Sequence, residues 1–335
     1  VSLGRFMHDK TYDVVGLGSA IVDAIAHADD SFIEEWGIDK GAMTLIDEQR
    51  AHLLYDAMGP ASETSGGSAA NTVAGVASFG GRAAFIGTVR DDQLGEIFRH
   101  DIRACGVEYD VPAGTEGPST ARCLILVTPD AQRSMSTYLG ISSLVDPANV
   151  DEALVAASKV VYCEGYLWDM PQTIEAIKKA FDRAREAGGK VAFALSDGFC
   201  VDRHREDFLR LVDERVDILF ANESEICSLY PGDGFEDAIG DVRNHCEIAV
   251  LTRSEQGSVV VTADETIRVP AVPTDVVDTT GAGDLYASGF LYGYTQGLDL
   301  GTCARLGSAA AAEVISHLGA RPLVDLTEIA DNVLV

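Results

Sequence analysis

Short apolar runs, rich in β-branched and aromatic residues, recur along the chain with helical patterns between them. Runs without polar alternation are typical of strands buried on both faces, as in a parallel sheet covered by helices. One intervening helix is plain over residues 173–187, where a single apolar face ends at Gly188-Gly189. The alternation therefore predicts an α/β protein with a mostly parallel central sheet. Its predicted strands are residues 14–17, 83–86, 160–162, 191–194, 218–220 and 248–251.

Two stretches break this rhythm, at about residues 20–48 and 107–140, where shorter apolar runs alternate with polar residues and turn formers. Within the second stretch, residues 122–127 and 134–139 flank Pro129-Asp130, a pattern that predicts a β-hairpin. No internal repeat or low-complexity linker divides the chain. We therefore expect a single domain over residues 1–335, with the two stretches forming a small β lid.

The charge balance excludes several classes of partner. With 25 Lys+Arg against 53 Asp+Glu, the net charge is −28, which disfavours nucleic acid and anionic membranes as partners. No apolar run reaches the roughly 18 residues of a membrane span, and residues 1–10 lack a signal-like stretch, so we expect a cytoplasmic protein. The seven scattered cysteines never adopt C-x-x-C spacing, which favours free thiols over disulfides or a zinc site.

Two familiar nucleotide motifs are incomplete. Residues 16–21 begin as a dinucleotide-binding loop, but Ile21 stands where the third glycine should be. Gly189-Lys190 lacks both the leading glycine and the following Ser or Thr of a P-loop. Any nucleotide must therefore be held by another arrangement.

The most specific feature is the string Asp278-Thr279-Thr280-Gly281-Ala282-Gly283-Asp284, followed by an apolar helical pattern. Small residues at 281–283 allow a ligand to approach the backbone, and amides at a helix N-terminus stabilise negative charge. Asp284 in the first turn could take a proton from an attacking hydroxyl. The alternative is a glycine-rich loop in which Asp284 only caps the helix.

The string resembles the second signature of the ribokinase-type (phosphofructokinase-B) family of sugar and nucleoside kinases. The family's first signature is similar to Gly66-Gly67-Ser68-Ala69-Ala70-Asn71 and the segment 80–89. Matches run in family order from about Asp13 to Arg321, nearly the whole chain. The resemblance implies a three-layer α/β/α fold with a β lid and ATP-dependent phosphorylation of an alcohol.

The resemblance also implies roles for individual residues. Asp284 would be the base, the amides of Gly281, Ala282 and Gly283 the anion hole, and Arg133 the lid arginine that closes on the phosphates. Asn222 and Glu225 would bind the nucleotide site, with Glu225 placing Mg²⁺ through water. The turn with Thr252 and Gly257 would contact ATP, although Ser254 replaces a glycine there. Asp278 and the backbone at Thr280 match positions where relatives hold a monovalent cation such as K⁺; the alternative is an Asp bonded to its own loop.

The acceptor follows from a second group of matches. Asp23 would receive two vicinal hydroxyls, with Ser19, Gly67 and Asn71 around it. Segments 30–33, 194–199 and 216–223 look more like adenosine kinases than like ribokinases or fructokinases. A purine also needs an apolar wall, for which the candidates are Leu139, Tyr166 and Trp168, unless these side chains only pack in the core or lid.

The sequence thus predicts a kinase acting on the 5′-hydroxyl of adenosine. A ribokinase or fructokinase remains an alternative, as does a non-catalytic nucleoside or sugar sensor. Lid strands in this family sometimes pair between subunits, which leaves monomer and homodimer equally open.

Overall fold

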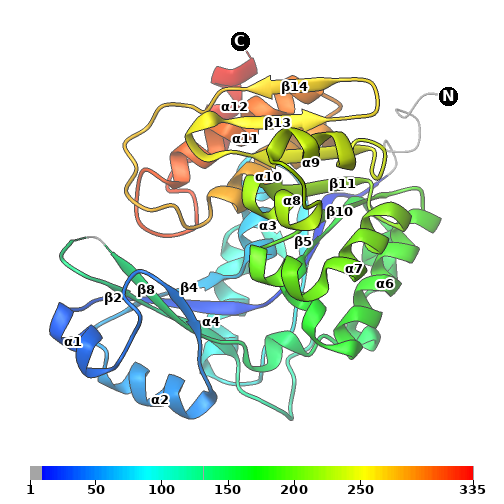
Figure 1. The fold of residues 1–335 in the computed structure, drawn as a ribbon. Helices are drawn as coiled ribbons and strands as arrows, with labels where there is room; N and C mark the ends of the chain where they lie inside the picture. The colour runs from blue at the N-terminus through cyan, green and yellow to red at the C-terminus, as the bar shows by residue number, and fades with distance from the viewer. Residues whose placement is uncertain (1–9, 131, 335) are drawn as a thin grey trace.

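A computed structural model of the chain describes residues 10–130 and 132–334. The backbone forms two sheets of unequal size (Figure 1). All six apolar runs lie in strands of the larger sheet, which is parallel from β6 to β12 and ends in two antiparallel strands. Its strands, in spatial order, are β14 (Thr266–Val269), β13 (Ser258–Val261), β12 (Ile248–Thr252), β11 (Ile218–Asn222), β10 (Lys190–Ala194), β9 (Ser158–Glu164), β1 (Tyr12–Leu17), β5 (Ala83–Ile86) and β6 (Val107–Glu108).

Helices lie on both faces of the larger sheet. On one side α10 (Ala282–Thr295) contacts both α3 (Ser68–Ser78) and α11 (Leu300–Val314), and α12 (Leu326–Leu334) contacts α3 and α11. The other side carries α6 (Pro171–Glu186), α7 (Gly198–Glu214), α8 (Glu223–Leu229) and α9 (Phe235–Val242) (Figure 1). Short helices α5 (Glu152–Ala156), η2 (Gly140–Ser143), η3 (Pro147–Asn149), η4 (Gly165–Asp169) and η5 (Ser254–Gln256) fill connections. No helix in the described parts of the chain is long and apolar enough to cross a bilayer.

The smaller sheet projects from the body beside α4 (Gln93–Ala104) (Figure 1). Its strand order is β3 (Met43–Leu45), β8 (Arg133–Tyr138), β7 (Ala121–Val127), β2 (Ile21–His27) and β4 (Ser62–Gly66). The predicted hairpin is confirmed, since β7 and β8 pair antiparallel. Helices α1 (Asp30–Glu35) and α2 (Glu48–Ala57) pack against one face through a small apolar cluster that includes Ile33, Leu54 and Leu124.

The second sheet differs in extent from the two stretches that the sequence singled out. Residues 62–66 add β4 at its edge, although the polar sequence Ser-Glu-Thr-Ser-Gly carries no apolar alternation. Residues 107–108 instead form β6 of the larger sheet. Both segments form strands because a neighbouring strand, β2 or β5, offers backbone hydrogen-bond partners, and not because of their own side-chain pattern.

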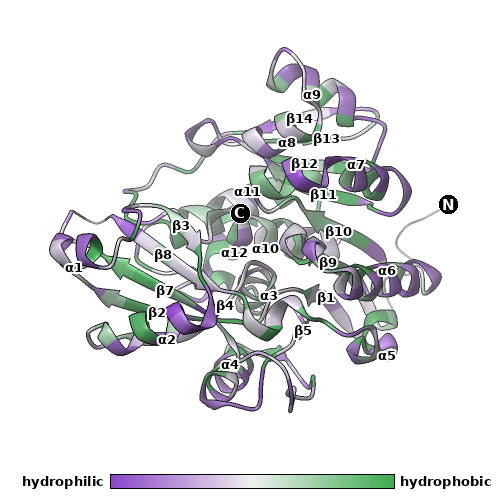
Figure 2. Ribbon diagram, turned by 60° about the horizontal axis from the view of Figure 1, so that its bottom comes forward, coloured by the Kyte–Doolittle hydropathy of each residue, from purple (hydrophilic) through white to green (hydrophobic). Residues whose placement is uncertain are grey.

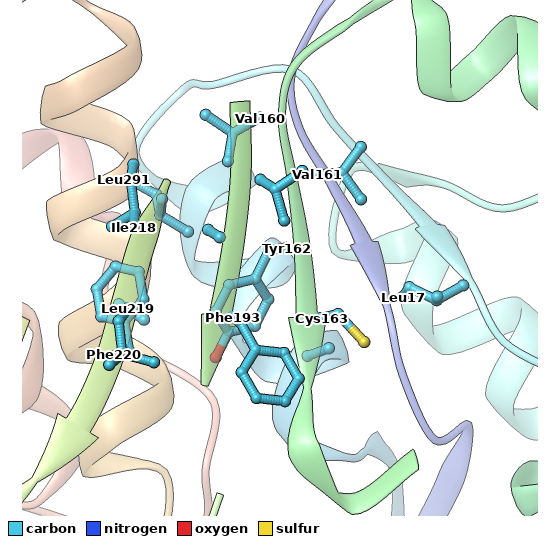
Figure 3. Close-up of a cluster of buried hydrophobic side chains, with 14 of the residues drawn as sticks. Leu17, Val160, Val161, Tyr162, Cys163, Phe193, Ile218, Leu219, Phe220 and Leu291 are labelled. Atoms are coloured by element: carbon cyan, nitrogen blue, oxygen red, sulfur yellow. The ribbon is translucent and has the colours of Figure 1, made fainter. Parts of the chain in front are cut away.

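The core is continuous across the larger sheet. Tyr162 and Phe220 (Figure 3) contact each other on the face that α10 covers, where Phe220 meets Phe290 edge-on with ring centroids 5.6 Å apart. Phe193 lies on the opposite face and packs against Phe208 of α7. Hydrophobic residues follow the central strands, whereas the outer surface of α6 is hydrophilic (Figure 2). All seven cysteines carry free thiols, four of them buried.

The topology brings several polar segments to one edge of the larger sheet. Parallel strands end at the same edge, so the residues after β1, β9, β10 and β11 come together there. The N-termini of α3 and α10 reach the same region, because α3 follows the smaller sheet and α10 packs along it. This edge is where a binding site is expected in such a sheet.

Helices α10 and α11 approach closely because glycines face the contact. A Cβ atom on Gly289 would lie 2.6 Å from the backbone carbonyl carbon of Leu306, closer than atoms can pack. The backbone there cannot move without separating two buried helices.

We therefore expect Gly289→Ala to lower the free energy of unfolding by about 1–3 kcal/mol through overpacking. Gly240→Ala is the matched control, since Gly240 lies on exposed α9 with no atom within 4 Å of its added Cβ. That change should stabilise by up to about 1 kcal/mol through helix propensity. Urea unfolding of both variants measures the difference; equal effects would contradict the packing argument.

Candidate active site

Asp284 lies in the first turn of α10 and joins the two motifs that the sequence singled out. Its Oδ1 accepts a hydrogen bond from Ser68 Oγ at 2.6 Å, and its Oδ2 accepts one from Asn71 Nδ2 at 2.9 Å. Both partners lie on α3, so the carboxylate joins two helices and does not cap its own. Burial raises the pKa of Asp284, while these two hydrogen bonds act in the opposite direction.

The turn before Asp284 leaves the helix N-terminus open. Gly281 adopts the left-handed conformation (φ 79°), and a Cβ there would lie 2.8 Å from that of Ala320. The N–H of Ala282 donates to the Thr279 carbonyl at 3.2 Å, whereas first-turn amides have no acceptor within their own helix. Gly283 is exposed, and a Cβ there would meet no atom within 4 Å. The amides of Gly283 and Asp284 are therefore the donors best placed for an anion.

Asp23, on β2, lies against the glycines of the first motif. A side chain at Gly66 would overlap the Asp23 carboxylate, and one at Gly67 (φ 102°) would overlap the Ser19 carbonyl. Burial raises the pKa of Asp23 to about 6, and the cations Arg321 and Arg133 oppose that rise. The glycines are thus required for close approach between Asp23 and the segment that leads to Asn71.

Glu164 binds the backbone of both segments that flank Asp23. At the end of β9 and 1% exposed, it accepts hydrogen bonds from Ser19 N at 2.8 Å and from Ala69 N at 2.7 Å. Burial raises the pKa of Glu164 to about 7. The sequence analysis did not select Glu164, Ser68 or Arg321. A carboxylate that ends an otherwise apolar buried strand was the signal available for Glu164.

Arg133, at the start of β8, links the smaller sheet to the loop before α10. It forms an ion pair with Asp278, and its Nη1 donates to Thr280 Oγ1 at 2.6 Å. The side chain is 8% exposed, so Arg133 is not a solvent-facing hairpin tip. Its Nε and Nη2 are buried without a hydrogen-bond partner among the described residues. Two donor nitrogens, Nε and Nη2, therefore remain to bind a ligand.

The surroundings of Asp278 do not fit the monovalent cation that the resemblance implied. Asp278 accepts hydrogen bonds from the amides of Thr280 and Gly319, each at 3.0 Å, as well as pairing with Arg133. Burial tends to raise the pKa of Asp278, but these partners hold it below its ordinary value. The guanidinium already supplies the positive charge at this carboxylate. A second cation on the same oxygens would meet it directly.

Asn222 and Glu225 form a capping box at the start of α8. Asn222 N and Nδ2 donate to the two oxygens of Glu225, and Glu225 N donates to Asn222 Oδ1. Burial raises the pKa of Glu225 to about 7. Within residues 10–130 and 132–334, no three His, Cys, Asp or Glu side chains cluster as ligands for a metal ion. Both Glu225 oxygens already accept hydrogen bonds from Asn222, so a Mg²⁺ at this site would have to keep most of its water and be held by Glu225 through it.

The turn after β12 has the geometry of a glycine-rich loop. Thr252 pairs with Ser258 in the sheet, and a side chain at Gly257 (φ 85°) would overlap the Val269 carbonyl. Ser254 stands where the related motif has a glycine, and its φ of 49° is in the left-handed region. The turn is thus retained at some strain.

The two aromatic residues of η4, Tyr166 and Trp168, differ in burial. Tyr166 is half-exposed, its N–H and hydroxyl bonded to Ser196 Oγ and the Ser196 carbonyl. Trp168 is 4% exposed and packs edge-on against Phe193 and Phe208. This packing places Trp168 in the core and gives no support to the base-stacking role expected for it. Leu139, half-buried just after β8, remains available.

Comparisons with known proteins give the family and the fold. The profile described as pfkB family carbohydrate kinase matches residues 54–326. A solved adenosine kinase from Sinorhizobium meliloti is 54% identical with a TM-score of 0.89, covering 96% of this chain and 99% of that one. A probable sugar kinase protein from Rhizobium etli CFN 42 is 50% identical with a TM-score of 0.90, covering 96% and 98%.

The curated relatives carry a different name. The 5-dehydro-2-deoxygluconokinase of Bacillus subtilis is 29% identical over 93% of this chain and 92% of its own length. The predicted ribokinase-like α/β fold, with a mostly parallel sheet and a second smaller one, is confirmed by the structural neighbours. Because the family match covers most of the chain and runs through both motifs, this protein is a phosphotransferase that belongs to the pfkB family of carbohydrate kinases.

Proposed function

We propose that the protein transfers the γ-phosphoryl group of ATP to the 5′-hydroxyl of adenosine, giving AMP and ADP. The observation that carries the chemistry is Asp284, held by Ser68 and Asn71 at the open N-terminus of α10. The choice of adenosine is supported by the 54% identity to a protein described as an adenosine kinase.

Asp284 acts as the general base. It accepts the proton of the attacking hydroxyl while the amides of Gly283 and Asp284 stabilise the charge on the transferring group. The buried free donors of Arg133 add to that stabilisation when the smaller sheet lies over the site. Glu225 would hold Mg²⁺ through water, and the ion would supply neutralisation of charge on the ATP phosphates. The smaller sheet then acts as a lid that excludes water.

Asp23 anchors the acceptor. Its two oxygens suit the vicinal 2′- and 3′-hydroxyls of a ribose, which both donate. Asn71 uses Nδ2 on Asp284, while its Oδ1 has no hydrogen-bond partner among the described residues. That oxygen is an acceptor for a further hydroxyl, and the Ser19 carbonyl lies beside Gly67 of the same segment.

An apolar row on the smaller sheet supports a nucleoside over a small sugar. Arg133, Met135 and Thr137 alternate on one face of β8, and Arg133 reaches Asp278, so this face points toward the body. The strand register places Asp23 in the row with Cys123 and Thr137. The adjacent row contains Ile25, Ile125, Met135 and Met43. An apolar surface next to a hydroxyl-binding Asp suits a base attached to ribose.

A sugar acid is the competing acceptor, because the curated relatives are 5-dehydro-2-deoxygluconokinases. We expect adenosine to exceed ribose, fructose and 5-dehydro-2-deoxygluconate by at least about tenfold in kcat/KM, since one apolar contact contributes roughly 1–3 kcal/mol. A coupled ADP-release assay with the four acceptors side by side tests this. Preference for any of the sugars would overturn the adenosine assignment.

Two variants sharpen the acceptor test. Met135→Ala should lower kcat/KM for adenosine but not the residual rate with ribose, whereas Asp23→Ala should impair every acceptor. Leu53→Ala is the control, because Leu53 is an exposed apolar residue on α2. Equal losses with adenosine and ribose in Met135→Ala would remove the apolar row from the base site.

Asp284→Asn tests the chemistry. The change keeps size and hydrogen-bonding reach but removes the capacity to accept a proton, so kcat should fall by about 10²–10⁴-fold. ATP binding, measured by calorimetry, should persist because the anion site consists of backbone amides. A variant that keeps most of its turnover would show that the base lies elsewhere.

Arg133→Ala should lower kcat at least about tenfold, since a desolvated charged hydrogen bond to the phosphates is lost. It should also lower the free energy of unfolding by about 1–3 kcal/mol, because the buried Asp278 loses its cation. The double variant Arg133→Ala/Asp278→Asn should regain stability without regaining kcat. Recovery of both would make Arg133 a structural residue only.

A further inference from the structure

Arg321, in the loop between α11 and α12, binds the backbone of the first motif from behind. Its Nε and Nη2 donate to the Ser65 carbonyl at 3.2 and 3.0 Å, and Nη2 also donates to Ser65 Oγ at 3.0 Å. Its Nη1 donates to the Ala70 carbonyl at 2.7 Å. The guanidinium therefore binds both ends of the segment 65–70. No local sequence pattern around Arg321 indicates this contact.

That segment carries the groups that contact both site carboxylates. Gly66 abuts Asp23, and Ser68 and the following Asn71 donate to Asp284. Glu164 holds the same segment from the other side through Ala69 N. Arg321 thus fixes the position of the hydrogen-bond donors of Asp284 without touching the carboxylate itself.

The charge of Arg321 is also available to the site. Its hydrogen bonds go to carbonyl and hydroxyl oxygens and not to a carboxylate. Asp101 accepts hydrogen bonds from Ser65 N and Oγ at 2.7 and 2.6 Å and, like the Cys105 thiol, faces Arg321 electrostatically, but neither is among the hydrogen-bond acceptors of the guanidinium. A buried cation without a direct carboxylate partner acts on charges over several ångströms, because the protein interior screens them weakly.

Burial raises the pKa of both Asp23 and Asp284, and Arg321 opposes the rise in each. The remaining charged or titratable groups that face these two carboxylates are Arg133 on β8, Cys123 on β7, Tyr162 and Glu164 on β9, Tyr166 on η4 and Glu225 on α8. Near Asp23 lie one cation, Arg133, and one thiol, Cys123. The two tyrosines and two glutamates lie near Asp284. For Asp284, Arg321 is the cation that offsets its acidic neighbours.

We propose that Arg321 is a positioning residue for phosphoryl transfer, which holds the segment 65–71 in place and keeps the acceptor-binding and base carboxylates ionised at neutral pH. This inference rests on the function proposed above, with Asp284 as base. In this proposal a residue outside both motifs controls the protonation state of Asp284.

The pH–rate profile separates charge from scaffold. Removal of the cation raises the pKa of Asp284 further, so the ionised base disappears at a higher pH than in the wild type. In Arg321→Gln we expect the acid limb of kcat/KM to move upward by about one pH unit. In Arg321→Lys the limb should stay in place, because the charge remains, while KM for adenosine rises because lysine cannot span both carbonyls.

Arg243→Gln is the matched control. Arg243 also donates to two carbonyls and a hydroxyl, those of Thr262, Glu265 and Thr266, but in the β13–β14 hairpin. Its substitution should leave the acid limb unchanged. An unshifted limb in Arg321→Gln, or equal shifts in the Lys and Gln variants, would overturn the proposal.

A folding measurement covers the case in which Arg321→Gln does not fold at neutral pH. If the charge is needed because Asp23 is ionised, then Asp23→Asn/Arg321→Gln should unfold at a higher temperature than Arg321→Gln alone. A double variant no more stable than the single one refutes the coupling. If Asp284→Asn loses turnover but the acid limb of Arg321→Gln does not shift, this inference is rejected and the proposed function stands. If Asp284→Asn keeps its turnover and its acid limb, the proposed function itself is rejected.

Discussion

The hydrogen bonds from Ser68 and Asn71 to Asp284 unite the molecule's function with its fold. They join the N-termini of α3 and α10, two helices that are more than 200 residues apart in the chain and pack on one face of the larger sheet. Because the dipoles of both helices point their positive ends at this junction, a carboxylate there is stabilised as an anion even though burial disfavours it. The larger sheet, the close contact of α10 with α11 and the glycines of both motifs are arranged so that these two N-termini can meet.

The site is built from buried charges in an acidic protein. With a net charge of −28, the chain surrounds its reacting centre with carboxylates, several of which have raised pKa values because they are buried. Two cations oppose this field from different directions. Arg133 comes from the smaller sheet and pairs with Asp278, whereas Arg321 comes from the loop after α11 and binds backbone carbonyls. A kinase must attract a polyphosphate into such a site, so fixed cations and open amides have to outweigh the surrounding negative charge.

In the proposed function, the base and the residues that select the acceptor come from different sheets. Asp284 and the amides beside it belong to the body, whereas Asp23 and the apolar row of Ile25, Ile125 and Met135 belong to the smaller sheet. Relatives with different named acceptors therefore can share one catalytic body and differ on the face of the lid.

Local sequence determined the elements whose formation depends on nearby residues. The apolar runs predict the parallel strands because such strands are buried on both faces, and the Gly-Ala-Gly-Asp turn predicts an open helix N-terminus with an acid beside it. Only the tertiary structure decided which side chains meet across the layers. Residues 62–66 form a strand because β2 offers them a partner. Trp168 lies in the core while Tyr166 remains partly exposed, a difference that periodicity cannot predict in a single 3₁₀ turn. Arg133 and Arg321 likewise have no local pattern that reveals their partners, because those partners lie about 145 to 256 residues away in sequence and come within reach only when the sheets and helices pack.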